Sequence, residues 1–336
     1  MRHKNQVFER YRNWRERGAE MVFAIVIETL GSTYAKPGDF MLITTDGEFQ
    51  GLLSGGCVEG DLALRAEQVG RDGGAAVIHY ELGGEDDALW GMGAGCEGSL
   101  RILLQSFAEP DFSRVFDTLA DRYAAGLDTR LAVSGTLPSV AWSLIDSMSG
   151  AAAFQWVESE STLDGRFKVT AAPHVLIAGG GADVMPLVDL FAALSWPVTV
   201  AEHREHYAMA LEDRPCKVVL GPAGELSTRV DMVAFDAVIV MSHHLETDIT
   251  YLSDIVRHHH WSYVGLLGPT HRKEKLIARV PAARELGGVL HGPVGLPLGG
   301  REPASIALSI VAHLHAVLAE NGRLTGEPDQ RVTRLG

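Results

Sequence analysis

The chain has 336 residues, 46% of them hydrophobic, and its formal net charge is −14. This length favours two domains, and this composition favours a globular protein with a full core. The acidic balance argues against a basic face for nucleic acid and against attraction to an anionic membrane, so we expect neither partner. Three cysteines leave one thiol over in any disulfide scheme, which indicates a reducing cytoplasm.

The N-terminal region predicts a helix followed by strands. Residues 4–17 are rich in charged side chains and lack the apolar centre of a secretory signal, so they predict a surface helix. Residues 21–29 are β-branched and apolar, which predicts a buried strand. Residues 40–45 and 51–54 predict two strands around the Asp46-Gly47 turn. No uninterrupted apolar run approaches the ~20 residues of a membrane span.

The most informative stretch is Ser54-Gly55-Gly56-Cys57-Val58-Glu59. Apolar residues recur at three- and four-residue intervals over 58–70, which predicts a helix and places Cys57 at its N-terminus. Free N–H groups and the positive dipole end stabilise a thiolate there, and the two glycines let a bulky group approach. We interpret Cys57 as a nucleophile or soft metal ligand at the mouth of a pocket. The alternative is a small buried hydrophobic residue.

Two neighbouring features bear on this cysteine. Glu59 stabilises the first helical turn, but its charge opposes a nearby thiolate, so it is either a proton acceptor for Cys57 or an ordinary acid at a helix start. Strands predicted at 75–82 and 100–105 enclose the glycine-rich residues 83–98, which include Cys96. Long ordered loops in compact domains are usually functional.

The middle of the chain predicts a helix over 110–126 and then short β-like runs over 128–170. These runs either complete the first domain or form a bridge. We therefore divide the chain into an N-terminal domain, a bridging segment of open assignment, a second domain and a loose polar tail, with bounds 1–107, 108–172, 173–320 and 321–336.

After Pro173 the predicted elements alternate between strand and helix, which is typical of a parallel sheet wrapped by helices. The predicted strands are 174–178, 198–201, 217–220, 237–241 and 263–267. The predicted helices are 185–194, 205–211, 248–258, 271–279 and 305–318.

The first strand of this domain leads into Gly179-Gly180-Gly181-Ala182-Asp183-Val184, which indicates a Rossmann-like turn. Gly179 permits the tight turn, Gly181 lets a pyrophosphate approach the helix N-terminus, and Glu202 could accept from a ribose hydroxyl. Val184 stands where a small residue is usual and would push the helix from the strand, and Pro186 would delay the helix start. These departures count against NAD(P), which stays open beside a fold kept for packing or protein contact.

Polar residues near later strand ends are further candidates. His243 and Asp248 follow a strand whose carboxyl end would point into the ligand crevice. The alternative is that His243 and His244 are two solvated histidines on a loop. Residues 258–260 are three histidines that would point in different directions on one helix, so we interpret them as surface. Arg272 and Lys273 at a helix start could bind a phosphate or be solvated.

Together these blocks resemble the XdhC/CoxI family, accessory proteins for molybdenum-cofactor enzymes of the xanthine dehydrogenase type. The resemblance covers almost the whole chain. It implies an α/β architecture with an N-terminal mixed α/β domain of the XdhC type and a C-terminal Rossmann-like doubly wound parallel sheet. The matching residues are Gly31-Ser32-Thr33, Pro37-Gly38, Ser54 to Glu59, Trp90-Gly91 through Cys96, Gly179 to Gly181, Val198 to Glu202 with Arg204, Gly265 to Gly268, His291 to Leu296, Pro303 and Ile306 to Leu308.

The resemblance implies that the chain binds and protects molybdenum cofactor (molybdopterin) and delivers it to a xanthine dehydrogenase-type molybdoenzyme. It also implies a cysteine desulfurase partner and a homodimer. The cofactor role falls on Cys57, since molybdenum is thiophilic, and the pterin phosphate would rest on glycine-rich backbone amides. The family commonly has Gly where this chain has Glu97, and Asp where it has Glu202.

Three other functions can be compared with this one from the residues alone. A complete molybdenum hydroxylase needs at least one Cys₄ iron–sulfur cluster, and three cysteines cannot form one. An NAD(P)-dependent oxidoreductase with His243 as acid or base leaves the cysteine-bearing domain unexplained. A thiol redox switch would join Cys57 and Cys96. A cofactor chaperone therefore fits better than a self-contained enzyme.

Overall fold

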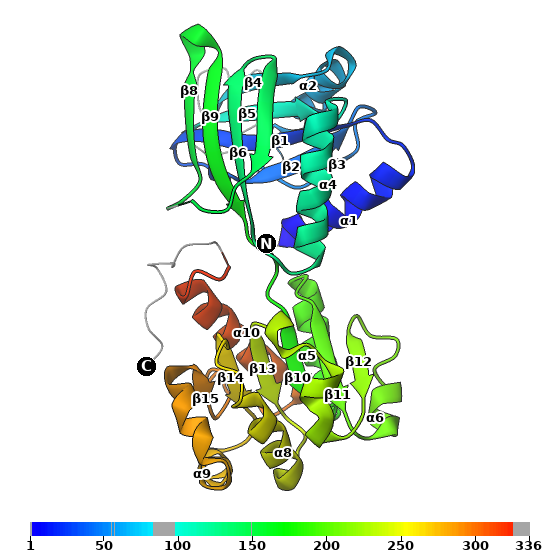
Figure 1. Ribbon diagram of the computed structural model, residues 1–336, viewed down its shortest axis with the longest axis vertical. Coiled ribbons are helices and arrows are strands. Elements are labelled where there is room, and N and C mark those ends of the chain that lie inside the picture. The colour runs from blue at the N-terminus through cyan, green and yellow to red at the C-terminus, as the bar shows by residue number, and fades with distance from the viewer. Residues whose placement is uncertain (1, 55, 57, 83–97, 149, 325–336) are drawn as a thin grey trace. The chain divides into compact units, whose positions relative to one another are not determined.

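The computed structural model describes residues 2–54, 56, 58–82, 98–148 and 150–324. The chain divides into two compact units, Met1–Ala171 and Ala172–Gly336, whose elements are traced in Figure 1. Residues 108–171, whose assignment the sequence left open, fold with the first unit.

The first unit contains a five-stranded antiparallel sheet in the order β3-β2-β1-β5-β4. The central strand β1 pairs with β2 from Met21 opposite Thr44 to Ile25 opposite Phe40, and with β5 along its other edge. The strands are β1 (Met21–Gly31), β2 (Phe40–Thr44), β3 (Phe49–Gln50), β4 (Ala75–Leu82) and β5 (Gly98–Ser106).

The prediction of a strand at 51–54 is wrong, because at Gly51 the chain leaves its hydrogen-bonded pairing with β2. Its φ of +118° is one that L-residues rarely adopt, and a Cβ there would lie 2.5 Å from that of Met41. The partner of β2 is β3, which lies just before this glycine. Residues 51–54 are thereby released to form a loop before the next helix.

A second antiparallel sheet completes the unit in the order β7-β6-β9-β8, with all pairs formed by neighbouring antiparallel strands. Its strands are β6 (Thr129–Thr136), β7 (Ser139–Leu144), β8 (Ala153–Val157) and β9 (Thr162–Val169). The helices of the unit are α1 (Arg2–Glu16), α2 (Glu59–Asp72) and α4 (Pro110–Ala124), with a short 3₁₀ turn η1 (Glu158–Glu160).

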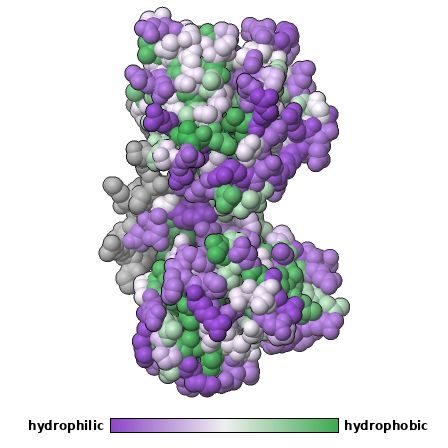
Figure 2. Space-filling model, in the orientation of Figure 1, coloured by the Kyte–Doolittle hydropathy of each residue, from purple (hydrophilic) through white to green (hydrophobic). Residues whose placement is uncertain are grey.

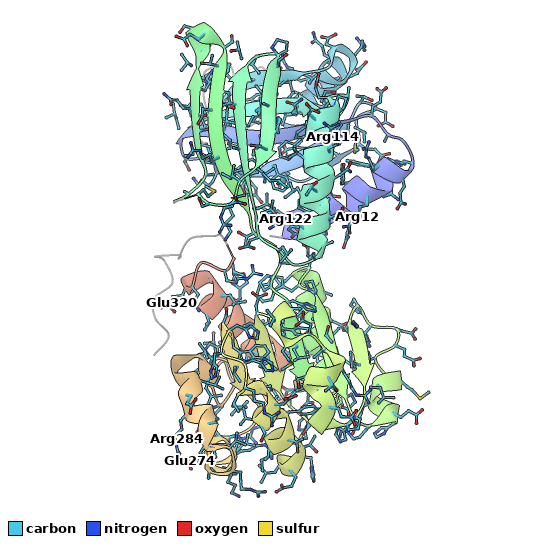
Figure 3. The ribbon with its side chains drawn as sticks, in the orientation of Figure 1. Arg12, Arg114, Arg122, Glu274, Arg284 and Glu320 are labelled. Carbon is cyan, nitrogen blue, oxygen red and sulfur yellow. The ribbon has the colours of Figure 1, made fainter. Side chains whose placement is uncertain are left out.

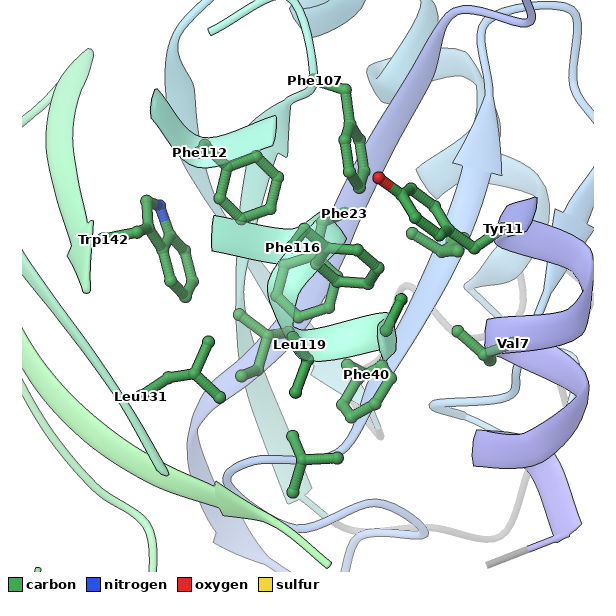
Figure 4. Packing of buried hydrophobic residues seen from close by; sticks show 14 of the residues in the cluster. Val7, Tyr11, Phe23, Phe40, Phe107, Phe112, Phe116, Leu119, Leu131 and Trp142 are labelled. Atoms are coloured by element: carbon green, nitrogen blue, oxygen red, sulfur yellow. The ribbon is translucent and has the colours of Figure 1, made fainter. Parts of the chain in front are cut away.

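Strand β1 is apolar on both faces and so belongs to two cores. Phe23 and Ile25 face a cluster formed with α1, α4 and the second sheet, while Val22 and Ala24 face a cluster formed with α2. Figure 4 shows the first cluster, where the ring centroids of Phe116 and Phe23 lie 5.3 Å apart.

A polar contact also joins two helices of this unit. In Figure 3 the labelled Arg12 lies on α1, and its Nη2 donates to the carbonyl of Ala120 on α4.

The second unit is a six-stranded parallel sheet in the order β12-β11-β10-β13-β14-β15. The order reverses between β10 and β13, so the doubly wound Rossmann-like fold is confirmed. Its strands are β10 (Val175–Ala178), β11 (Val198–Glu202), β12 (Lys217–Leu220), β13 (Ala237–Val240), β14 (Tyr263–Leu266) and β15 (Leu290–His291).

Helices pack around this sheet. Helix α5 packs on α10, and α8 packs on α9. The helices are α5 (Val184–Ala193), α6 (Glu205–Met209), α7 (Leu226–Arg229), α8 (Leu245–Ile255), α9 (Thr270–Arg279) and α10 (Pro303–Glu320), with 3₁₀ segments η2 (Ala223–Glu225), η3 (Met232–Ala234) and η4 (Pro281–Val289).

Several local expectations differ from this structure. Helix α5 begins at Val184, which is fully buried, and Pro186 occupies the first turn, where its missing N–H is not needed. The histidines at 258–260 follow the end of α8 at Ile255 and lie outside any helix. Strand β15 was not predicted.

Helix α10 is long and apolar enough by composition to cross a membrane, yet Ile310, Leu314 and Leu318 are fully buried within the unit. It is therefore a core helix of the second unit. In Figure 2 the visible surface of each unit is mostly hydrophilic, which agrees with apolar side chains lying inside.

Candidate functional site

Glu59 organises the loop before α2. Its side chain is only 2% exposed, and its carboxylate accepts hydrogen bonds from the backbone amides of Leu53 and Ser54, both at 2.8 Å, and of Gly56 at 3.1 Å. The Ser54 hydroxyl also donates to this carboxylate and accepts from the amide of Val58 at 2.8 Å. We call residues 53–58 the cysteine loop, since Cys57 belongs to it.

This network decides the charge of Glu59. Burial alone would raise the pKa of its carboxyl, but the hydrogen bonds from the Ser54 hydroxyl and from the Ser54 and Leu53 amides outweigh burial, so that pKa is lowered. The ionised carboxylate thus acts as an internal anion for the cysteine loop. Of the two interpretations offered from sequence, neither anticipated this structural role.

The prediction that a pterin phosphate rests on glycine-rich backbone amides stays a prediction, but the described amides of this loop are already engaged. The amides of Leu53, Ser54 and Gly56 already donate to Glu59, and that of Val58 donates to Ser54. An external anion would have to displace a buried carboxylate to reach them. Cys57, Gly55 and Cys96 lie outside the described residues, so their predicted roles stay predictions.

In the second unit, Glu202 ends β11 and is fully buried. Its Oε1 accepts from the amides of His203 and Arg204 and from Arg204 Nε, each at 2.8 Å. Its Oε2 accepts from Arg204 Nη2 at 2.9 Å and from the amide of Gly180. Burial opposes ionisation, but the Arg204 guanidinium and the Gly180 and Arg204 amides lower the pKa of Glu202 to about 2.

Five donors therefore converge on a carboxylate that offers about four lone-pair sites. The predicted role of Glu202, accepting from a ribose diol, would require some of these bonds to break. Arg204 also stacks on Tyr207, with Cζ 4.2 Å from the ring centroid. Glu202 serves the packing of the glycine turn in this structure.

The glycine turn is shaped by the sheet itself. Gly179 has φ of +112°, and a Cβ there would lie 2.5 Å from the backbone N and Cα of Ser242 at the end of β13. Gly181 faces His243, whose ring would lie 3.2 Å from a Cβ at that glycine. The structure thus brings the predicted residues Gly179, Gly181 and His243 together at the switch between β10 and β13.

A cavity of about 200 Å³ lies beside this switch and is lined by His243, Asp248, Leu267, Gly268, Pro269 and Arg272. Asp248 is 1% exposed and accepts from the Ser242 amide at 3.0 Å, from the Ser242 hydroxyl, and from Arg272 Nη2 at 2.6 Å. His243 has φ of +63°, and its Nε2 lies 3.2 Å from Asp183 Oδ2. The structure places Arg272, whose role the sequence left open, in the same cavity as the two predicted residues His243 and Asp248.

A segment in each of the two units matches the model of a known protein family. Residues 175–314 match the model described as the XdhC Rossmann domain, and residues 14–81 match the model of the XdhC and CoxI family. The chain belongs to the XdhC/CoxI family. Both matches fall where the sequence resemblance placed them, one in each unit.

Two proteins similar to this family member extend over nearly the whole chain. One, from Bacillus subtilis, is named as a probable subunit of xanthine dehydrogenase and is 27% identical over 88% of this chain and 92% of its own length. The other is a crystal structure described as a xanthine dehydrogenase from Bacillus halodurans, with 25% identity and a TM-score of 0.77, covering 97% of this chain and 98% of its own.

Sequence reasoning missed a histidine cluster in the Rossmann domain. His291 stacks on Tyr263 with ring centroids 4.4 Å apart, and the Tyr263 hydroxyl lies 3.1 Å from His313 Nδ1. Burial, with His313 and Lys273 nearby, lowers the pKa of His291 to about 4. The cluster joins β14, β15 and α10, far apart in sequence. Among the described residues no group of three His, Cys, Asp or Glu could hold a metal ion.

Proposed function

We propose that this XdhC/CoxI family member is a maturation factor that binds molybdenum cofactor, protects it, supports its sulfuration and delivers it to a xanthine dehydrogenase-type enzyme. Family membership and the names of its relatives support an accessory role toward such an enzyme. The cofactor is cargo in this scheme. Its molybdenum is a soft centre suited to a thiolate such as Cys57.

The observation that carries this proposal is the set of hydrogen bonds by which Glu59 and Ser54 hold the described residues on either side of Cys57. Gly56 precedes Cys57 and Val58 follows it, and the amides of both flanking residues are hydrogen-bonded within the loop. Backbone that is held in place before a ligand arrives loses little further conformational entropy on binding. Glu59 is therefore a positioning residue for the described residues next to Cys57, and a cargo phosphate that reached their amides would have to displace its carboxylate.

The same structure disfavours an oxidoreductase role. The ribose-binding acid expected of an NAD(P) enzyme, Glu202, is engaged by five donors of its own chain. A complete molybdenum hydroxylase is excluded by the cysteine count, since one Cys₄ cluster needs four. The proposed role accordingly needs separate partners: the molybdoenzyme itself and a cysteine desulfurase. A homodimer and a cytoplasmic location complete the proposal.

The decisive experiment measures cargo in natively purified protein. Molybdenum by mass spectrometry and pterin by fluorescence after oxidation should be near stoichiometric in the wild type, and most of both should be lost in Cys57→Ser. Cys216→Ser is the matched control, since burial raises the pKa of the Cys216 thiol and it lies in the other unit. Full retention of cargo in Cys57→Ser would remove Cys57 from the proposal.

Delivery needs a second measurement. Loaded protein added to an apo-enzyme of the xanthine dehydrogenase type should restore its activity faster than an equal amount of free cofactor. Pretreatment with a cysteine desulfurase and cysteine should increase the restored activity if sulfuration occurs on this chain. Restoration no faster than with free cofactor would reject delivery.

A further inference from the structure

The cavity beside the switch between β10 and β13 has a composition that suits one class of ligand. Its polar members are the ion pair of Asp248 and Arg272 together with His243, and its remaining walls are Leu267, Gly268 and Pro269. We propose that it binds the phosphate monoester of a small organic molecule. All of its lining residues lie in the second unit, so binding at this site can be measured separately from cargo binding at Cys57.

Arg272 supplies the first reason. A guanidinium has five N–H donors. Among the described residues, the Arg272 guanidinium makes one hydrogen bond, from Nη2 to Asp248 at 2.6 Å, so its other N–H groups remain for a ligand. Its side chain is 22% exposed and lies against Gly268, where a Cβ would meet its Cδ at 2.5 Å. A fork of donors held in a fixed position at a cavity wall is suited to phosphate oxygens.

Asp248 supplies the second reason, because it does not offer a site to a cation. Its Oδ1 accepts from both the amide and the hydroxyl of Ser242, and its Oδ2 accepts from Arg272. The carboxylate therefore fixes the guanidinium, and both of its oxygens are already engaged. An anionic group is favoured over a metal ion.

The remaining walls indicate what the anion is attached to. Leu267 and Pro269 are apolar, and the half-exposed ring of His243 stands at the rim. A volume of about 200 Å³ is below the ~300–1,000 Å³ of pockets that enclose whole drug-sized ligands, so part of the ligand would extend outside. A pterin or a nucleoside carrying one phosphate meets these requirements.

A dinucleotide fits less well than a monophosphate. Its adenosine ribose would need the carboxylate of Glu202, which is occupied by Arg204 and the neighbouring amides. We therefore expect a monophosphate ester to bind without disturbing Glu202, and NAD to gain nothing from its second nucleotide.

The test is isothermal titration of the full-length protein, in buffer free of phosphate and sulfate, with AMP, with a pterin phosphate, and with NAD. Arg272→Gln should weaken monophosphate binding at least about ten-fold, equivalent to ~1.4 kcal/mol. Arg279→Gln is the matched control, because Arg279 also reaches from α9 to an acid of α8, Glu246, at 3.0 Å but lies outside the cavity. Its affinity should stay within about two-fold of wild type.

Since Arg272→Gln leaves Asp248 buried without its cation, the double variant Asp248→Asn/Arg272→Gln tests the site with both charges removed, and it should also lose binding. Tighter binding of AMP or of the pterin phosphate identifies the source of the monoester. No saturable binding of either at about 10 mM, or equal weakening by Arg272→Gln and Arg279→Gln, would overturn the assignment.

Discussion

Ser54 and Glu59 are joined by two hydrogen bonds inside the first domain: the Ser54 amide and hydroxyl both donate to the Glu59 carboxylate, while the same hydroxyl accepts from the amide of Val58. The Glu59 carboxylate also accepts from the amides of Leu53 and Gly56, so it ties these described residues to the first turn of α2. Its contribution to folding and its contribution to cargo binding can therefore be measured separately.

Glu59→Gln should lower the free energy of unfolding by roughly 2–3 kcal/mol, because an amide cannot accept from every donor that the carboxylate now satisfies. Urea denaturation at neutral pH measures the change. Glu67→Gln, on the exposed side of the same helix where Glu67 pairs with Arg71, should change stability by less than about 0.5 kcal/mol. Equal stability of the wild type and Glu59→Gln would show that the loop does not depend on this charge.

Stability at acid pH should depend on Glu202. Its folded-state pKa of about 2 lies below the ordinary value of 4.5, so its stabilising contribution is present above that ordinary value and is lost as pH falls toward 2. The melting temperature of Glu202→Gln should therefore fall less steeply between pH 4.5 and 2 than that of the wild type. Glu225→Gln, at an exposed pair with Arg229, should follow the wild-type slope, and parallel slopes for all three proteins would contradict the prediction.

His291 gives a pH dependence in a milder range. Its pKa of about 4 in the folded chain, against 6.5 ordinarily, means that the unfolded chain takes up the proton first as pH falls. Its neutral form therefore favours folding above pH 6.5, and this advantage is lost between pH 6.5 and 4. The urea midpoint should fall less between pH 7.5 and 5 in His291→Asn than in wild type, whereas the exposed His259→Asn should leave the fall unchanged.

The aromatic core of the first unit should contribute strongly to the free energy of unfolding. Phe116 is 1% exposed and contacts the rings of Phe8, Tyr11 and Phe23. Phe116→Ala should cost about 3–5 kcal/mol, since it leaves a cavity among rigid rings. Leu64→Ala, at a position 70% exposed on α2, should cost less than about 0.5 kcal/mol by the same denaturation measurement. A cost for Phe116→Ala close to that of Leu64→Ala would mean that this core is not tightly packed.

Most of the fold could be predicted because its strands are short apolar runs bounded by turn residues. The runs at 21–29 and 174–178 became β1 and β10, and Pro303 opened the last helix as expected. The failures have local causes. The positive φ of Gly51 takes the chain out of the ladder where the strand at 51–54 was predicted to begin, and β15 is too short, at two residues, to leave a periodic pattern.

The candidate sites could be predicted by position but not by partner. The sequence placed Glu59 and Glu202 correctly at a helix start and a strand end, yet both carboxylates proved to be bound by their own chain. Arg204, two residues after Glu202, was a signal that could have suggested this. The pairing of Asp248 with Arg272 joins residues on different helices, so no local pattern could reveal it.

The close packing at Gly179 affects how a glycine at this position is interpreted in related sequences. Because the neighbouring strand end at Ser242 leaves no room for a Cβ, the sheet excludes every other residue type there, whatever the domain binds. A lineage that lost a nucleotide would still inherit this glycine. A glycine at this position therefore reflects the clearance between two strands, and nucleotide binding has to be judged from side chains that the sheet does not itself require.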